Sequence, residues 1–321
     1  MRPVLLSTLK HLSTLASGIG KQKKLLILIY HRVLDEPDFM RPDEIDKEIF
    51  LWHMDLISNY FNVLPLDLAL ERMREDRLPP RAVCITFDDG YVDNLYNATP
   101  ILLKNNLTAT FFIASGYLDG GRMWNDSVIE AVRKIEDKKL DLREIDLEEY
   151  ELKSDKDRML AAINIIQKIK YLPPELRQNK VDYITSIENN SSENLMLTTN
   201  QLQQLHKEGM EIGGHTLTHP ILSNLVKAKA EHEIAENKNI LESIIKNKIK
   251  FFAYPNGRPG VDYLPEHMKM LKNYKYEAAF STKWGVATIK SDVWQLPRFT
   301  PWDATPEKFI ARLIRVYSSF I

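Results

Sequence analysis

The chain has 321 residues, of which 44% are hydrophobic and 27% charged, and its formal net charge is −1 at pH 7. This length supports a large core, as one α/β domain or two smaller ones. The near-neutral balance argues against a basic surface for nucleic acid. The single cysteine, Cys84, excludes an internal disulfide and is predicted to be a buried thiol.

Residues 1–24 are predicted to form a basic amphipathic arm. Apolar residues recur at helical spacing from Leu5 to Ile19, and no acidic residue precedes Asp35. No apolar run here is long enough to cross a bilayer, and Lys10 interrupts the position of a signal-peptide core. Two placements of the arm stay open, on the domain or on an anionic membrane face. We expect a cytoplasmic protein, with peripheral contact at the inner membrane face as the second option.

Short apolar runs alternate with helical patterns in the first third of the chain. Strands are predicted at 24–30, 82–87 and 108–113, since continuous apolar runs of this length suit buried parallel strands. Helices are predicted at 45–60 and 91–106, where apolar residues recur three and four positions apart. This order indicates a parallel sheet with helical crossovers.

The middle of the chain breaks this alternation. Residues 138–158 are dense in charge, Ser154 opens a capped helix, and Pro173-Pro174 opens another. We interpret about 126–194 as a mostly helical insertion on the main domain.

The alternation then returns. The predicted helices are 199–207 and 220–246, and the predicted strands are 210–213, 248–253, 276–281 and 294–299. No glycine-rich phosphate loop follows the first strand. A distorted (β/α) barrel of about seven strands is therefore favoured over an open doubly wound sheet. Residues 25–321 are expected to form this single domain around the insertion.

Polar side chains follow four of the predicted strands at the point where each strand ends. They are His31-Arg32, Asp88-Asp89-Gly90, the run from Gly214 to His219, and the run from Tyr254 to Gly257. The carboxyl ends of the strands of a barrel face one mouth, so we expect these groups to lie close together.

His215 and His219 are four residues apart. On a helical turn this spacing places both imidazoles on one face, about 5–6 Å apart at Cβ. Two histidines and a carboxylate can hold a divalent metal with positions left for water and substrate. The alternative is a pair of solvated or capping histidines. A cation would also offset the repulsion between Asp88 and Asp89, with one carboxylate bound to it and the other taking a proton from water.

Three motifs are similar to those of a known family. "TFDDGY" (86–91), "HTLTH" (215–219) and "FAYPNG" (252–257) resemble the first three motifs of the NodB-like polysaccharide deacetylases, carbohydrate esterase family 4. The resemblance extends from Leu25 to Phe299 outside the insertion. The flanking "ILIYHRV" and "LPRFTPWD" look like the bacterial deacetylases attached to exopolysaccharide or surface-glycan loci.

The resemblance implies a hydrolase that removes N-acetyl groups from N-acetylated amino sugars in a glycan or a lipid-linked glycan precursor. Asp88 would be the general base, and the backbone N–H of Asn256 would help hold the oxyanion. One divalent metal per chain is implied, with zinc expected, and its ligands would be Asp89, His215 and His219. Sugar contacts are expected from Tyr91, Tyr254, Pro255 and Trp302.

The chain departs from the family pattern at two positions. Family members have an arginine before the proline of the third motif, where this chain has Tyr254, and we propose that Arg298 supplies the charge from another strand. The late histidine that serves as general acid is also missing, and His31 is the candidate substitute. The alternatives are a surface arginine or an ordinary ion pair at 298, and a hydrogen-bonded core histidine at 31.

Two other functions stay open on these departures. One is a hydrolase of the same fold acting on a non-carbohydrate amide, such as a formamide. The other is a catalytically silent barrel that binds a glycan or a protein partner. The remaining histidines lie on predicted helices and are interpreted as surface residues: His11, His53, His206, His232 and His267.

Overall fold

The computed structural model describes residues 14–18, 23–187 and 194–318. Most of the arm predicted at 1–24 lies outside them, so its placement and the cellular location stay predictions. No helix within the described ranges has both the length and the apolar character that crossing a membrane requires.

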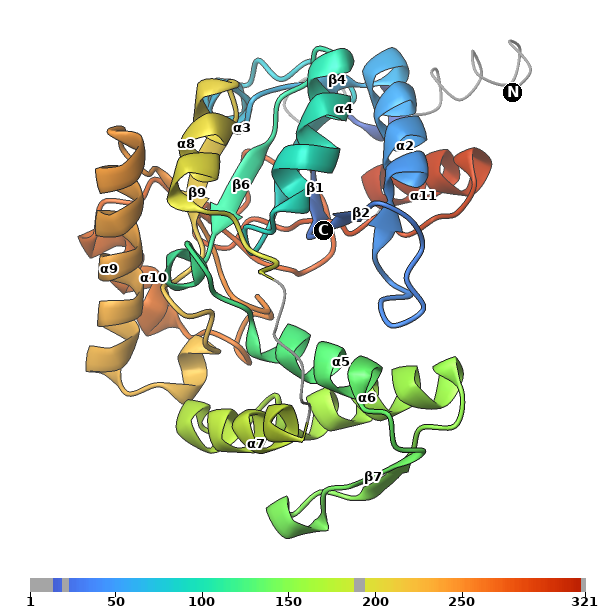
Figure 1. The fold of residues 1–321 in the computed structure, drawn as a ribbon. Helices are drawn as coiled ribbons and strands as arrows, with labels where there is room; N and C mark the ends of the chain where they lie inside the picture. Colours follow the sequence, from blue (N-terminus) through green and yellow to red (C-terminus); the bar gives the residue numbers. More distant parts are fainter. Residues whose placement is uncertain (1–13, 19–22, 188–193, 319–321) are drawn as a thin grey trace.

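The centre of the fold is a curled sheet of seven parallel strands (Figure 1). Its order is β1 (Leu25–Tyr30), β5 (Ala82–Phe87), β6 (Thr110–Ile113), β9 (Glu211–Gly214), β10 (Phe251–Ala253) and β11 (Ala278–Phe280), with β4 (Asn62–Val63) paired to the start of β5. Two short strands, β2 (Val33–Leu34) and β3 (Ile45–Asp46), pair separately. The predicted distorted barrel is confirmed.

The segment around 296–299 closes the gap between the two ends of the sheet. Leu296 bridges to Phe280 of β11, and Phe299 bridges to Leu28 of β1, both in parallel. The strand predicted at 294–299 is thus reduced to isolated bridges, yet it lies where a barrel strand would. This placement carries residue 298 to the mouth of the barrel.

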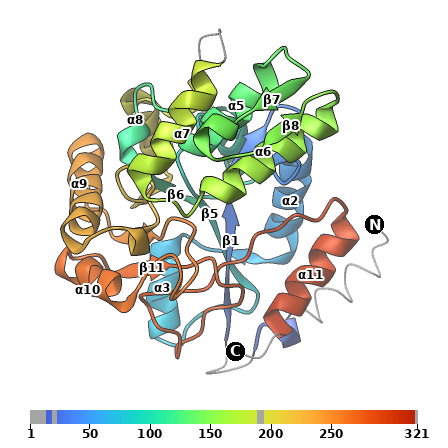
Figure 2. The ribbon, with the colours of Figure 1, turned by 90° about the horizontal axis from the view of Figure 1, so that it is seen from below.

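Helices surround the sheet (Figures 1 and 2). They are α2 (Lys47–Tyr60), α3 (Leu66–Arg74), α4 (Thr99–Lys104), α8 (Thr199–Lys207), α9 (Lys227–Ile245), α10 (Pro265–Asn273) and α11 (Pro306–Ser318).

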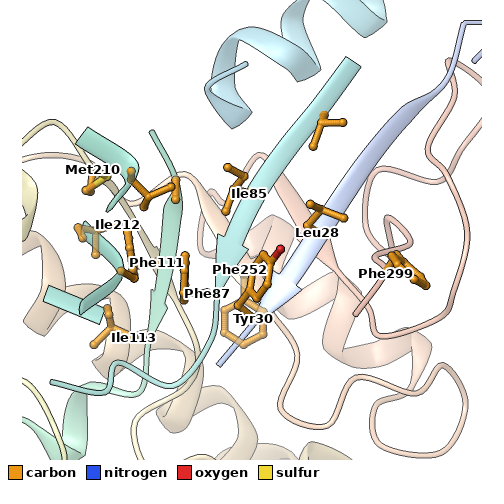
Figure 3. Close-up of a cluster of buried hydrophobic side chains, with 14 of the residues drawn as sticks. Leu28, Tyr30, Ile85, Phe87, Phe111, Ile113, Met210, Ile212, Phe252 and Phe299 are labelled. Atoms are coloured by element: carbon orange, nitrogen blue, oxygen red, sulfur yellow. The ribbon is translucent and has the colours of Figure 1, made fainter. Parts of the chain in front are cut away.

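Alternate residues of the strands pack against these helices. Leu28 and Tyr30 of β1 and Ile85 and Phe87 of β5 belong to the larger apolar cluster, together with residues of the neighbouring strands (Figure 3). Residues between them, among them the buried Cys84, join a second cluster that includes α3. Burial on both faces explains why these strands are continuous apolar runs in the sequence.

Two helices begin differently from the prediction. The helix expected at 91–106 opens with a π-helical turn at Asn94–Ala98, shortly after the Asp88-Asp89 turn. Such turns are frequent at functional sites. The helix expected at 220–246 begins only at Lys227, because 222–224 form a 3₁₀ turn held by tertiary hydrogen bonds.

The middle of the chain forms its own layer at one end of the barrel (Figure 1). Its elements are α5 (Trp124–Lys134), the hairpin β7–β8 (Lys139–Asp141 and Glu149–Glu151), α6 (Asp155–Ile169) and α7 (Pro174–Ser186). They share a separate apolar cluster. Arg41, in the loop before α2, joins the layer to the barrel through ion pairs with Asp126 at 2.9 Å and Glu130 at 2.7 Å.

The carboxyl group of Glu211, at the start of β9, makes the stability of the fold depend on pH. Burial raises its pKa to about 7 from an ordinary value of 4.5, although Thr110 Oγ1 donates a hydrogen bond to it at 2.7 Å. A raised folded-state pKa gives stabilisation that is complete below about pH 4.5 and is lost as the pH rises through 7. Glu211→Gln should remove this dependence. Between about pH 5 and pH 8, its free energy of unfolding should rise relative to that of the wild type by at most about 3 kcal/mol.

Thermal or urea unfolding of both proteins across that range tests the prediction. Parallel stability curves for the two proteins would contradict it. Thr110→Val is the matched control, since it removes the hydrogen-bond donor and leaves the carboxyl group in place.

Candidate active site

The carboxyl ends of the barrel strands open into a cavity of about 350 Å³. Its lining comes from the strand ends, the loop before α2, and the layer that contains α5 and α6: His31, Glu44, Asp88, Asp89, Tyr91, Met123, Trp124, Asn125, Ile166, Lys170, His215, His219, Asn256 and Thr282. Figure 2 views the molecule from this end, with α5, α6 and α7 toward the reader. The four strand-end groups singled out in the sequence therefore meet in one place.

The turn after β5 points the adjacent carboxylates of Asp88 and Asp89 toward different partners. Asp88 N–H donates to the Tyr30 carbonyl at 2.9 Å, which continues the pairing of β5 with β1. Asp89 and Gly90 then adopt left-handed backbone conformations, with φ of 79° and 95°. This conformation is costly for aspartate, and a side chain at Gly90 would come within 3.1 Å of Ile113.

Asp89, His215 and His219 bring three potential ligand atoms together. Asp89 Oδ1 lies 3.3 Å from His215 Nε2 and 3.4 Å from His219 Nε2. The three ligand atoms lie within 4.8 Å of one another. His215 Nδ1 lies 2.7 Å from the Ala253 carbonyl, so a proton on Nδ1 leaves the Nε2 lone pair available.

This set fits a divalent cation. Among the described residues, the buried Asp89 Oδ1 has no hydrogen-bond partner, although two imidazole nitrogens face it. A buried carboxylate oxygen without a partner is costly. A cation bound by the carboxylate and both imidazoles would satisfy it, and two histidines with one carboxylate suit zinc and similar metals.

The HTLTH segment is an irregular loop, so the helical geometry assumed from its spacing is wrong. Thr216 and His219 have left-handed backbones, with φ of 64° and 53°. The Glu233 carboxylate of α9 accepts hydrogen bonds from the backbone N–H groups of Leu217 and Thr218, at 2.9 and 2.8 Å. The loop and this anchor bring the rings of the two histidines to a centroid distance of 4.8 Å.

Burial and neighbouring charges set the protonation of these three groups. Burial alone would raise the pKa of Asp89, but His219 and His215 outweigh it and hold that pKa below its usual range. Burial lowers the pKa of His219 to about 4. At His215 the two aspartates outweigh burial and raise the pKa. An ionised carboxylate and a neutral imidazole are ready to bind a cation, whereas at His215 the cation competes with a proton at low pH.

Asp88 is held by Arg298 from the segment that closes the barrel. Arg298 Nη1 and Nη2 each donate to one carboxylate oxygen at 2.7 Å, and Nε donates to the Ser281 carbonyl at 3.1 Å. The arginine is fully buried, which excludes the surface alternative. Burial alone would raise the pKa of Asp88, but Arg298 outweighs it and lowers the pKa. The carboxylate is therefore ionised and fixed in orientation.

Comparison with known proteins agrees with the motifs and the geometry. The sequence profile of the family "Polysaccharide deacetylase" matches residues 75–152 and 172–280, more than half of the chain. The chain belongs to this family.

Individual relatives of this family member are distant. YxkH of Bacillus subtilis (strain 168), provisionally named a polysaccharide deacetylase, is 20% identical over 278 residues, which are 87% of this chain and 71% of that protein. The Streptococcus pyogenes deacetylase PplD, solved in complex with acetate, has a TM-score of 0.61 at 17% identity and covers 92% of this chain and 98% of its own. IcaB from Ammonifex degensii has a TM-score of 0.57 at 18% identity, with coverage of 94% and 98%. The two solved structures show that the fold is shared.

Three further residues predicted for the site line the same cavity of this polysaccharide deacetylase family member: His31, Tyr91 and Asn256. The Tyr91 hydroxyl donates a hydrogen bond to Asp126 of α5 at 2.8 Å, so Tyr91 joins the barrel to the layer that contains α5. Asn256 has a left-handed backbone with φ of 58°, and its carbonyl accepts a hydrogen bond from Thr282 Oγ1 at 2.6 Å. Its own N–H has no hydrogen-bond partner among the described residues.

Three of the residues predicted to contact the sugar do not line this cavity. Tyr254 is buried, stacks on another tyrosine ring and donates its hydroxyl to the Trp294 carbonyl at 2.9 Å. Pro255 is buried in the same turn. Trp302 is 42% exposed, but it stacks on Trp284 with ring centroids 4.8 Å apart. Aromatic rings gain from packing on one another, and nearness to a motif in sequence does not tell on which side of a turn they pack.

Two histidines interpreted as surface residues are buried, so that interpretation is wrong for them. His53 Nδ1 lies 3.2 Å from the Tyr30 hydroxyl, and its ring stacks on Phe309 at 4.1 Å between centroids. His267 Nδ1 accepts the Leu264 N–H at 2.9 Å and so caps α10. Each has at least one ring nitrogen in hydrogen-bond contact inside the protein, which a helical pattern rich in charge does not reveal.

Sequence reasoning also missed Glu44 in the cavity lining. Its carboxylate accepts the Arg32 N–H at 3.3 Å, and burial raises its pKa. Glu44 lies in an irregular loop between β2 and β3, and no motif marks it. Only the folded chain brings this carboxyl group beside the strand ends.

Proposed function

We propose that this protein is a metal-dependent hydrolase that removes N-acetyl groups from N-acetylated amino sugars in a glycan or a lipid-linked glycan precursor. One observation carries the proposal. Two neighbouring carboxylates have separate partners. Asp89 Oδ1 faces His215 and His219 and accepts no hydrogen bond, whereas Arg298 holds Asp88. A binding module has no need of this division, whereas hydrolysis needs both a metal ligand and a base.

Asp89, His215 and His219 would hold the metal, and zinc is the proposed ion. Bound there, the cation supplies Lewis-acid chemistry at the acetyl carbonyl and lowers the pKa of water. Ala253 orients His215 through its carbonyl, and Glu233 orients the loop that carries His219. These contacts fix the ligand positions before the cation binds.

Asp88 would accept the proton of the attacking water. His215 Nε2 lies 3.9 Å from Asp88 Oδ2, so the base borders the metal ligands. Arg298 keeps the carboxylate ionised, and both of its oxygens are oriented by the bidentate contact. Water oxygen then bonds to the acetyl carbon, the carbon–nitrogen bond breaks, and acetate and a protonated amine are the products.

Asn256 and His31 are proposed for the other two tasks. The Asn256 N–H would donate to the oxyanion that develops on the acetyl group, and its lack of a partner among the described residues supports this role. His31 would deliver the proton to the leaving nitrogen, which must be protonated to leave as an amine. Its place in the cavity lining supports the role.

The proposal is tested by acetate release. The zinc-loaded protein is incubated with a tetramer of N-acetylglucosamine, and free acetate and new amino groups are measured together. We expect equal amounts of both products from the wild type and none from His215→Ala. A metal-loaded wild type that releases no acetate from neutral or anionic N-acetylated oligosaccharides would contradict the proposed function.

His31→Ala should lower kcat by about 10²-fold, the scale of a lost general acid, with metal content unchanged. The pH–rate profile should also change, because the group that delivers the proton to the leaving nitrogen is gone. Measuring both on one substrate separates this role from a structural one. An unchanged pH–rate profile would count against His31 as the acid.

A further inference from the structure

The insertion supplies part of the cavity wall from a segment outside the family match. The profile matches 75–152 and 172–280. The intervening stretch contains α6, whose last turns bring Ile166 and the C-cap residue Lys170 into the lining of the catalytic cavity. This part of the cavity wall therefore lies outside the motifs that the family shares. Residues here can set the substrate selectivity of this particular chain.

Lys170 is a cation without a counterion. It is half-buried, burial lowers its pKa, and its ammonium lies 5.9 Å from the centre of the Tyr171 ring. Within the described residues the Lys170 ammonium forms no ion pair or hydrogen bond. Asp262, whose charge it feels, is already paired with Arg258 at 3.2 Å and accepts the Tyr171 hydroxyl at 3.0 Å.

The carboxylates of the cavity are engaged elsewhere. Asp88 is held by Arg298, and Asp89 faces the two histidines. Glu44 accepts a backbone N–H and forms no ion pair with Lys170. Among the residues that the structure describes, Lys170 is also the only lysine or arginine in the lining. Partial burial without a partner costs free energy, and a bound anion would recover it.

We propose that Lys170 binds an anionic group of the substrate, a carboxylate or a phosphate, close to the sugar that loses its N-acetyl group. The inference rests on the proposed function and specifies its substrate class as an acidic glycan. The apolar side chains of Trp124 and Ile166 line the same cavity and exclude water from part of it, which strengthens an ion pair there. A neutral glycan would leave the ammonium without a partner.

The kinetic test compares N-acetylated substrates that differ in charge. They are the neutral N-acetylglucosamine tetramer, a hyaluronan tetrasaccharide with carboxylates, and UDP-N-acetylglucosamine with phosphates. The wild type should favour one anionic substrate over the neutral one by about 10- to 100-fold in kcat/KM. Lys170→Met should abolish that preference, mainly through KM, and lower kcat/KM for the neutral tetramer far less than for the anionic substrate. Lys170→Arg should keep most of it.

Lys168→Met is the matched control. Lys168 lies near the same end of the helix, is exposed and forms an ion pair with Glu148. It should leave the preference intact. Which anionic substrate is favoured tells whether the group is a carboxylate or a phosphate. Equal losses on neutral and anionic substrates, or no loss on either, would overturn the inference, as would a melting temperature that falls in Lys170→Met while selectivity stays.

A binding measurement keeps this inference distinct from the proposed hydrolysis. Titration calorimetry with the zinc-loaded protein measures Kd for the same two anionic compounds and for the neutral tetramer. Weaker binding of an anionic compound by Lys170→Met alone supports the site even without acetate release. Identical Kd values in the wild type and Lys170→Met for all three compounds overturn it.

Discussion

Asp88→Asn is expected to keep its metal and to lose turnover by about 10²- to 10⁴-fold, the range of a lost general base. The amide cannot accept the proton of water at neutral pH. The metal ligands Asp89, His215 and His219 are untouched by the change, so zinc content measured by mass spectrometry should stay at the wild-type level. Acetate release under saturating substrate measures the loss.

Asp89→Asn is the matched variant on the neighbouring residue. It should lose the metal and the activity together, because the carboxylate that faces both histidines is gone. Full activity in Asp88→Asn would remove Asp88 as the base. Loss of metal from both variants would show that the two carboxylates do not have separate roles.

Arg298→Met is expected to be the most damaging change to stability and to impair catalysis as well. It leaves Asp88 buried without its bidentate partner, and breaking a buried ion pair in this way costs about 3–5 kcal/mol. The pKa of Asp88 should rise, since burial is no longer opposed. The acid limb of the pH–rate profile should therefore move to higher pH. Urea unfolding and the pH–rate profile measure the two effects.

Two further variants separate charge from packing at this pair. Arg298→Lys keeps the charge but loses the bidentate contact with Asp88. Compared with Arg298→Met, it should therefore recover part of the stability and little of the turnover. Asp88→Asn combined with Arg298→Met removes both charges and should be more stable than Arg298→Met alone. An unchanged pH–rate profile in Arg298→Met would contradict the assignment of Arg298 as the residue that holds the base.

The strands and the general fold could be predicted because buried parallel strands leave a strong mark in sequence. β5 has the predicted bounds, and β1 lies within its predicted range. In the part of the chain that the structure describes, the strand predicted at 294–299 is present only as isolated bridges, from Leu296 to β11 and from Phe299 to β1. The late start of α9 depends on tertiary hydrogen bonds of the 222–224 turn, which no local pattern contains.

The candidate site was predictable where residues cluster in motifs and unpredictable where only the fold assembles them. The Asp88-Asp89 pair and the two histidines follow strands, so a barrel brings them together. The placement of Arg298 was inferred from a missing charge in the third motif. Glu44 and Lys170 had no such signal, because each enters the cavity from an irregular loop or a helix end.

The central claim is a metal site at Asp89, His215 and His219. The most direct measurement is the metal content of the protein purified without added metal, beside His215→Ala prepared in the same way. We predict about one divalent ion per chain in the wild type and its loss in the variant. An absence of bound metal in both proteins, even after incubation with zinc and removal of the excess, would contradict the metal-dependent mechanism.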